Sequence, residues 1–209
     1  GDVYKRQEYV YPLYVDTSKA VNQGNSSTQE LGDEKETIIS NLNGDIIKKL
    51  SDCLGVEPFP EDLLDYIYAI LHSSNYREKF KEQLKYQFPR IPYPQNEEDL
   101  KKIASLGNHL CHLHLMDNTA AWKAKSKFPF KGNGSSIIVK PQWKDGKVYI
   151  NKENYYDNVP EDYIGGYQIA EKWLKDRKDT ELDFNAIIHY SNILYVLTQT
   201  IYLSKEIDK

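Results

Sequence analysis

The spacing of apolar residues changes from a helical to a strand-like pattern after residue 130, and this change limits what the chain can fold into. Residues 60–71 and 97–116 place apolar side chains three or four positions apart, which is the spacing of a helix with one buried face. Further along, short apolar runs at 137–139 and 148–150 flank a Lys-Asp-Gly-Lys turn at 144–147, as expected for a β-hairpin. The sequence therefore predicts an α+β fold that is mostly helical, with a small antiparallel sheet including a basic β-hairpin.

Capping residues mark where several helices start and stop. Pro60 and Asn96 stand at the starts of the two clearest helices, and Gly55 follows a helix expected at residues 37–54. The remaining predicted elements are an edge strand at residues 8–15, a polar loop at 16–36, helices at 76–86, 168–175 and 183–205, and an extended proline-rich segment at 88–94.

The chain is large enough to bury its own core. Its 209 residues are 40% hydrophobic, which suits one domain or two closely packed subdomains. No run of about eighteen apolar residues occurs, and the first residues lack the charged, apolar and small-residue order of a signal peptide. These features predict a cytoplasmic protein without a membrane partner.

Positive charge is concentrated in one stretch of the chain. Between residues 120 and 152 there are eight lysines and one acid, Asp145, which gives this stretch a charge of +7. Because the whole chain carries −4, the remaining residues together carry −11. Such a stretch is a candidate for binding a polyanion such as DNA, although a solvated lysine-rich loop explains the charge equally well at this point.

A pair of glycines, Gly165 and Gly166, precedes a short helix rich in cations. Paired glycines allow the backbone to approach a ligand closely, and the free N–H groups at a helix start suit a phosphate. The polar and cationic side chains that follow are Tyr167, Gln168, Lys172, Lys175, Arg177 and Lys178. A structural turn with Trp173 buried behind it is the competing interpretation, and both can hold together.

Residues 109–114 contain three histidines and a cysteine, which are common zinc ligands. On a helix His109 and His112 share a face, but Cys111 points elsewhere and no second ligand pair such as CxxC occurs, so packing and surface roles are favoured over zinc. The sequence contains no GxSxG elbow, phosphate-binding loop, convincing nuclease acid pair or Asn-Pro-Pro-Tyr methyltransferase motif. We therefore expect no catalytic, cofactor-binding or metal-binding residues in this chain.

Four motifs of the chain resemble those of one known family. They are LLDYIYAILHS at residues 63–73, YREK at 76–79, FPRIPYP at 88–94, and YIGGYQ at 163–168 running into KWLKDRK at 172–178. In this order they are similar to the C-terminal specificity domain of type ISP and type IIG restriction-modification enzymes. The resemblance implies a target-recognition module for a short asymmetric DNA site, which directs adenine-N6 methylation and cleavage carried out by other domains.

The resemblance also implies partners and cofactors outside this chain. Whole enzymes of the family carry an adenine-N6 methyltransferase, a nuclease and, in the type ISP group, an ATP-driven translocase upstream. S-adenosylmethionine, Mg²⁺ and, in the translocating group, ATP are therefore expected to serve those upstream domains. Double-stranded DNA is the expected partner of this chain.

Recognition of this kind needs cations on phosphates, and amide or cationic side chains at base edges. The residues that we expect to contact DNA lie in the hairpin and after the paired glycines: Lys140, Gln142, Lys144, Lys147, Tyr167, Gln168, Lys172, Arg177 and Lys178. Two alternatives stay open. The helices can form a protein-interaction scaffold that docks the recognition domain onto the methyltransferase or helicase, or the chain can be a free-standing enzyme of unknown chemistry, which no catalytic motif supports.

Residues 1–7 do not resemble the start of a natural protein. The chain begins with Gly1 rather than methionine, and the DVYKRQ that follows is the translation of a transposon end used in sequencing adapters. We expect residues 1–7 to be an artefact and residues 8–209 to be the C-terminal part of a DNA target-recognition domain whose protein continues upstream.

Overall fold

The computed structural model describes residues 11–17, 38–116, 124, 126–160 and 167–209, which form a mostly helical molecule with two small antiparallel sheets. The elements in chain order are β1 (Tyr14–Asp16), β2 (Ile38–Ser40), α1 (Gly44–Leu54), α2 (Pro60–His72), α3 (Ser74–Lys79), η2 (Gln83–Lys85), α4 (Glu97–His114), β3 (Phe130–Lys131), β4 (Gln142–Lys144), β5 (Lys147–Tyr149), β6 (Tyr155–Tyr156), α6 (Tyr167–Lys175) and α7 (Phe184–Ile207). The α+β fold class predicted from the sequence is confirmed.

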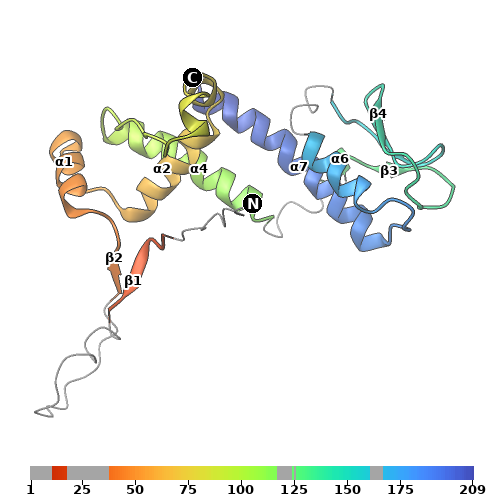
Figure 1. Cartoon of the computed structure of the whole chain (residues 1–209), viewed down its shortest axis with the longest axis horizontal. Coiled ribbons are helices and arrows are strands. Elements are labelled where there is room, and N and C mark those ends of the chain that lie inside the picture. The colour runs from red at the N-terminus through yellow and green to blue at the C-terminus, as the bar shows by residue number, and fades with distance from the viewer. Residues whose placement is uncertain (1–10, 18–37, 117–123, 125, 161–166) are drawn as a thin grey trace, which may run out of the picture.

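Residues 38–116 build a helical lobe at one end of the molecule (Figure 1). Its centre is the pair α2 and α4, which pack so closely that a Cβ atom at Gly107 would lie 1.9 Å from the carbonyl oxygen of Asp65. Both helices begin as predicted, with Pro60 in the first turn of α2 and the Asn96 side chain accepting a hydrogen bond from the Asp99 N–H at 2.8 Å. These residues either satisfy or remove the backbone N–H groups that a helix start leaves free.

Residues 126–160 and α6 form a sheet lobe at the other end (Figure 1). Its strands lie in the order β3-β6-β5-β4, and every neighbouring pair is antiparallel. One face of the sheet packs on α6 and α7: Tyr156 is fully buried, its ring centre lies 4.7 Å from that of Tyr190 in α7, and Ala170 and Leu174 of α6 belong to the same buried cluster. This inner face holds the core of the lobe.

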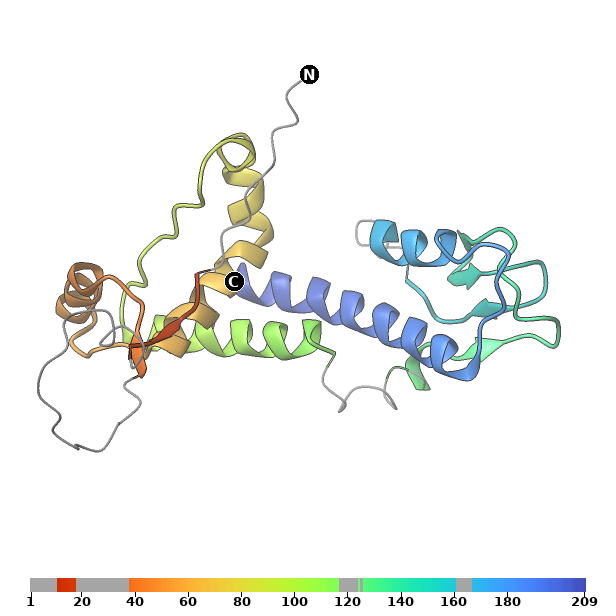
Figure 2. The ribbon, with the colours of Figure 1, turned by 60° about the horizontal axis from the view of Figure 1, so that its bottom comes forward.

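Helix α7 joins the two lobes. Tyr190 in its first half is buried in the core of the sheet lobe, whereas Leu203 in its second half is buried in a cluster with Leu110 of α4. Figure 2 shows α7 running alongside α4 and reaching the sheet lobe with its other end. Beyond α7, the carboxylate of Asp208 accepts a hydrogen bond from the Ser73 hydroxyl at 2.5 Å, which fixes this end of the helix to the junction of α2 and α3.

Three local predictions are wrong in detail. The helix expected at residues 37–54 starts only at Gly44, and residues 38–40 form β2, which pairs with β1. The helix expected at 76–86 ends at Lys79 and is followed by the short 3₁₀ turn η2. The apolar run at 137–139 lies outside the regular hairpin strands, which cover only Gln142–Lys144 and Lys147–Tyr149. Ile137 forms an isolated bridge with Glu181, whereas the Val139 N–H donates to the Ile150 carbonyl oxygen beyond the end of β5.

Several predictions fall partly or wholly outside the described residues. The adapter artefact at residues 1–7, most of the polar loop at 16–36 and the glycine pair at 165–166 belong to this group. The strand expected at 8–15 is described only from residue 11, and there it forms β1 at Tyr14–Asp16.

Candidate nucleic-acid interface

The predicted hairpin is present, and its turn explains why Asp145 and Gly146 occur there. Both residues have a positive φ, 51° and 74°, as a type I′ turn requires, and Asp and Gly tolerate this conformation better than most residues. The turn joins β4 to β5 and places Lys144 directly opposite Lys147. Since β4 is the last strand of the sheet, the hairpin stands at the border of the sheet lobe.

Side chains alternate between the two faces of the sheet, and the strand register decides which residues share a face. Trp143, Val148 and Tyr156 pair across β4, β5 and β6 on the inner face, against α7. The residues between them form the opposite surface, which we call the outer face: Lys131, Gln142, Lys144, Lys147, Tyr149 and Tyr155. The fold therefore brings together Gln142, Lys144 and Lys147, three of the predicted DNA-binding residues.

Lys131, Tyr149 and Tyr155 belong to the outer face but were not among the predicted site residues. The two tyrosine ring centres lie 5.2 Å apart, and the Lys147 ammonium lies 4.5 Å from the centre of the Tyr155 ring. A ratio of seventeen tyrosines to six phenylalanines is a general sign of semi-exposed aromatic surface. Assigning these two tyrosines to the outer face, however, requires knowing that β5 pairs with β6. A strand as short as β6, with two residues, cannot be recognised in the sequence.

The outer face keeps most of its positive charge. Lys131 donates a hydrogen bond to the Asp157 carboxylate at 2.7 Å, and this contact raises the pKa of Lys131 and lowers the pKa of Asp157. Lys144 lies only within 4.0 Å of its exposed neighbour Asp145, a contact that water weakens. Lys147 lies over the Tyr155 ring and forms no ion pair within the described residues, although its charge also helps to lower the pKa of Asp157. At least two lysines therefore remain able to meet an external anion.

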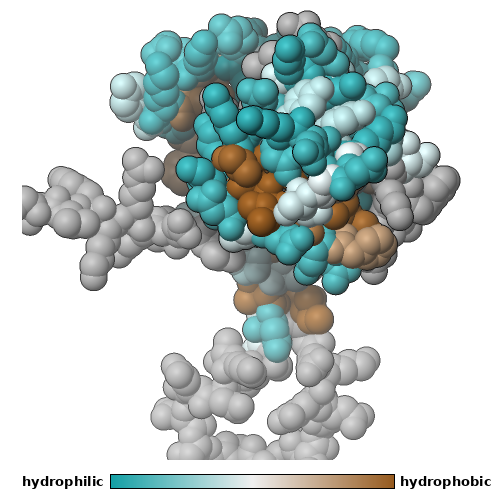
Figure 3. Space-filling model, turned by 90° about the vertical axis from the view of Figure 1, so that its right-hand side faces the viewer, coloured by the Kyte–Doolittle hydropathy of each residue, from teal (hydrophilic) through white to brown (hydrophobic). Residues whose placement is uncertain are grey.

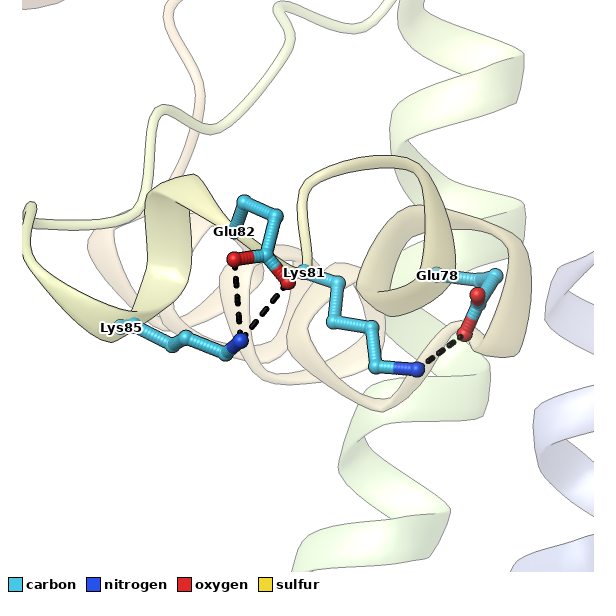
Figure 4. A network of polar contacts seen from close by, with 4 residues as sticks. All are labelled: Glu78, Lys81, Glu82 and Lys85. Carbon is cyan, nitrogen blue, oxygen red and sulfur yellow. Dashed lines mark hydrogen bonds and ion pairs between the residues drawn. The ribbon is translucent and has the colours of Figure 1, made fainter.

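Several lysines of the helical lobe differ from these, because a glutamate lies within ion-pair distance of each. The Lys81 ammonium lies 3.5 Å from Glu78, and the Lys85 ammonium lies 2.7 Å from Glu82 (Figure 4). Residues 38–116 hold nine lysines and arginines against eleven acids, whereas residues 126–160 hold six lysines against three acids. The excess of positive charge is therefore a property of the sheet lobe.

Lys140 lies just before β4 and lines a groove together with Gln142, Ile137 and Val139. The groove has a volume of about 670 Å³. It places Lys140 next to Gln142 on the border of the outer face, so all four predicted hairpin residues are neighbours in the folded chain.

The second predicted group lies on and after α6. Lys172 pairs with Asp176 at 2.7 Å, and the Arg177 guanidinium stacks 3.9 Å from the centre of the Trp173 ring while donating a hydrogen bond to the Trp173 carbonyl oxygen. Lys178 is exposed. Tyr167 and Gln168 form the first turn of α6, but their side chains lie outside the described residues. Of this group, Lys178 and Arg177 are the cations best placed to meet an anion.

The two predicted groups belong to different layers of the sheet lobe. The hairpin residues point from the outer face, whereas α6 packs with α7 on the inner face. The chain after α6 returns to the sheet edge, where the Ile138 N–H donates to the Thr180 carbonyl oxygen at 3.0 Å and the Asp179 N–H donates to the Ile138 carbonyl oxygen at 2.7 Å. Arg177 and Lys178 directly precede residues 179–182, the segment that lies beside residues 136–138 next to the groove. Lys172 belongs to α6, on the other side of the sheet from the hairpin residues.

Of the three histidines of α4, His114 takes a structural position, whereas His109 and His112 are exposed. His114 is half-buried; its Nδ1 contacts the Tyr68 hydroxyl at 2.6 Å and its Nε2 contacts the Thr200 hydroxyl at 2.7 Å. Within the described parts of the chain, no three His, Cys, Asp or Glu side chains come together in a way that could hold a metal ion. None of the described helices is long and apolar enough to cross a membrane.

Three solved structures have a similar fold. The cryo-EM structure of the DrdV–DNA complex matches with a TM-score of 0.64 and 20% identity, over 82% of this chain and 20% of that chain. The ATP-dependent type ISP restriction-modification enzyme LlaBIII bound to DNA matches with a TM-score of 0.58 and 17% identity, over 88% of this chain and 13% of that chain. A nuclease-deletion mutant of the type ISP enzyme LlaGI with a DNA substrate mimic matches with a TM-score of 0.51 and 20% identity, over 74% of this chain and 17% of that chain.

The chain thus spans a fifth or less of each of these solved chains, and at such identities the likeness establishes a common fold. No curated protein matches the sequence. The family comparison is more specific, because residues 2–206 match the type ISP C-terminal specificity domain. Since this match extends over nearly the whole sequence, the chain belongs to the family of type ISP C-terminal specificity domains.

Proposed function

We propose that this chain recognises a site in double-stranded DNA and that the outer face of the sheet lobe makes the principal contacts. The observation that carries the proposal is the strand register, which gathers three lysines, a glutamine and two tyrosines on one surface opposite the helices. Lysines supply affinity for phosphates, while amide side chains can distinguish base edges. A two-stranded β-ribbon also has dimensions that the major groove admits.

The residues divide into two roles in this proposal. Lys140, Lys144 and Lys147 neutralise phosphates, and Gln142 between them meets base edges. Arg177 and Lys178, which follow α6, extend the contact along the DNA backbone, whereas Lys172 lies on the opposite layer and pairs with Asp176. The exposure of Lys178 and the position of residues 179–182 beside residues 136–138 support this extension.

Methylation and cleavage belong, in this proposal, to other domains of a longer enzyme. The chain covers at most 20% of the solved chains that share its fold. S-adenosylmethionine, Mg²⁺ and ATP would serve the adenine-N6 methyltransferase, nuclease and translocase parts, and the present chain would place the methyltransferase over its target. We expect such an enzyme to act in the cytoplasm, where bacterial DNA lies.

A second role, as a docking scaffold, is favoured by apolar side chains exposed on the helical lobe. Phe59 is 70% exposed, Phe88 81% and Leu115 67%. Single exposed apolar residues are ordinary, but several large ones around one lobe are a feature of protein interfaces. The two roles are compatible, because the scaffold surface lies on the helical lobe and the proposed DNA surface on the sheet lobe.

Salt-dependent binding to a random-sequence duplex tests the proposal. We expect the logarithm of the binding constant to fall steeply with the logarithm of salt concentration, and the slope to decrease by roughly 2 to 3 in a variant with Lys140, Lys144 and Lys147 all changed to Glu. The matched control changes Lys79, Lys81 and Lys85 of the helical lobe to Glu, with the same change in net charge. Equal losses in both variants would mean that only net charge matters, and no binding by the unaltered chain would leave the docking role as the better account.

A further inference from the structure

The groove beside the hairpin has an unusual combination of surfaces. Ile137 and Val139 are the exposed large apolar side chains of residues 126–160, at 40% and 53% exposure, and both line the groove with Lys140, Gln142 and Lys152. Figure 3 views the end of the molecule that carries the sheet lobe and shows apolar surface enclosed by hydrophilic surface. The groove thus combines apolar side chains with the amide of Gln142 and the ammonium groups of Lys140 and Lys152, so it can make both apolar and polar contacts with a ligand.

A β-bulge explains why these side chains point outward together. Ile138 and Trp143 both face the core, although a strict alternation cannot place two residues five positions apart on one face. The N–H groups of Val139 and Lys140 both donate to the Ile150 carbonyl oxygen, at 2.9 and 3.2 Å. Two residues opposite one is the pattern of a bulge, which re-aims the side chains beside it, so Val139 and Lys140 reach the surface that also carries Gln142.

The two amide side chains of the groove, Asn151 and Gln142, differ in how many hydrogen bonds they make. The Asn151 side chain is fully used: its Nδ2 donates to the carbonyl oxygens of Ser135 and Ile137, and its Oδ1 accepts from the N–H groups of Glu153 and Asn154. Gln142 is exposed, and its side chain makes no hydrogen bond to any other described residue. Its amide oxygen and N–H groups therefore remain available to a ligand.

The charges around the groove favour a nucleic-acid occupant. Lys140 and Lys152 form no ion pair within the described parts of the chain, and Lys144 and Lys147 lie on the adjoining hairpin. The acid of the groove, Glu153, folds toward Gly134, where a Cβ atom would lie 1.9 Å from its Oε2. The phosphates of a DNA duplex would contact the lysines, and the base edges in its groove would face Gln142, Ile137 and Val139.

We propose that this groove reads an A·T base pair in the major groove of DNA, with Gln142 on the adenine and Val139 and Ile137 against the thymine methyl group. A glutamine amide can accept from adenine N6 and donate to adenine N7, while the thymine of the same pair presents its C5-methyl group at the same edge. The inference rests on the proposed DNA-binding function and deepens it, because it names which base pair the chain selects and which residues select it.

Selection from a pool of random duplexes gives the first test. The unaltered chain should enrich sequences with an A·T pair at a fixed position, and Gln142→Ala should reduce the preference for that pair roughly tenfold. Gln83→Ala, which changes an exposed glutamine of the helical lobe, should leave the preference unchanged. Enrichment of a G·C pair, or of no pair at all, by a chain that still binds DNA would overturn the inference and leave the proposed function intact.

Replacing thymine by uracil in the selected duplex gives a second test that needs no protein variant. Uracil lacks the C5-methyl group but pairs identically, so binding should weaken about fourfold if one methyl group is buried. The difference between thymine and uracil should shrink in Val139→Thr and persist in Val56→Thr, which alters an exposed valine of the helical lobe. Equal binding of the two duplexes by the unaltered chain would refute the thymine contact, whereas absence of DNA binding would refute the proposed function itself.

Discussion

The two lobes of this molecule are stabilised in different ways. In the helical lobe, α2 and α4 pack along their length with small residues at the contact, Ala69, Ala104 and Gly107. In the sheet lobe the strands are two or three residues long, and side-chain hydrogen bonds to the backbone hold the loops between them. Asn154 alone bonds to Gly134 twice and to Ser135 once.

This difference shows how one chain can combine a regular helical lobe with a sheet lobe whose surface depends on individual side chains. Regular helices satisfy their own backbone groups, so their surfaces depend on few particular side chains. Short strands and long loops leave backbone groups that individual asparagines must satisfy, and the groove and outer face depend on them. The surface that we propose to read DNA is thus the part whose shape can change with few substitutions.

Gly107→Ala is the strongest way to break the helical lobe. The new Cβ would meet the Asp65 carbonyl oxygen at 1.9 Å and its carbon at 2.7 Å, and both belong to the backbone of α2, so the two helices must separate. We expect the free energy of unfolding to fall by about 3 kcal/mol, measured by urea denaturation with far-UV circular dichroism. The control is Gly44→Ala, at a site with no atom within 4 Å, which should leave stability nearly unchanged.

Tryptophan fluorescence in a Trp122→Phe background reports on the other lobe, because the two remaining tryptophans, Trp143 and Trp173, both pack against the core of the sheet lobe. Since α7 contributes buried residues to the cores of both lobes, we expect the fluorescence and dichroism transitions to coincide in Gly107→Ala. Separate transitions would show that the two lobes unfold independently and that α7 does not couple them.

Asn154→Ala tests the sheet lobe with a smaller expected effect. The side chain is 1% exposed; its Oδ1 accepts from the Gly134 N–H at 3.1 Å and its Nδ2 donates to the carbonyl oxygens of Gly134 and Ser135. Removing it leaves these backbone groups without partners, which should cost about 2 kcal/mol. Asn133→Ala, at an exposed position of the same loop, should cost almost nothing, and equal effects of the two substitutions would contradict the role assigned to Asn154.

The same contrast explains how much could be predicted from the sequence. Helices α2 and α4 follow from local signals, namely apolar periodicity with Pro60 and Asn96 at the starts, and the hairpin turn follows from Asp145-Gly146. The local pattern extends the first helix over residues 38–40, because their actual pairing with residues 14–16 is not local and leaves no signal there. Distant pairing also decides the outer face and the bulge, so Tyr149 and Tyr155 could not be assigned to the site before the register was known.

The smallest expected effect concerns pH and the helical lobe. The Thr200 hydroxyl donates to the Val196 carbonyl oxygen at 2.8 Å, so it accepts from His114 Nε2–H, and Nδ1 of the same ring must accept from the Tyr68 hydroxyl. This arrangement needs the neutral imidazole. Burial, together with the charge of His72 nearby, lowers the pKa of His114.

A folded-state pKa below the unfolded value means that His114 contributes stability above the unfolded pKa of about 6.5 and loses it as the pH falls through the folded pKa. Because the ring is only half-buried, solvent screens the effect, and we expect a loss of roughly 0.5 kcal/mol below pH 6. Urea denaturation of His114→Gln should lack this pH-dependent part, whereas His109→Gln, at an exposed position of the same helix, should retain it. If both variants kept the full pH dependence, the titrating group would lie elsewhere, and the bonds from His114 to Tyr68 of α2 and Thr200 of α7 would not be what makes the stability depend on pH.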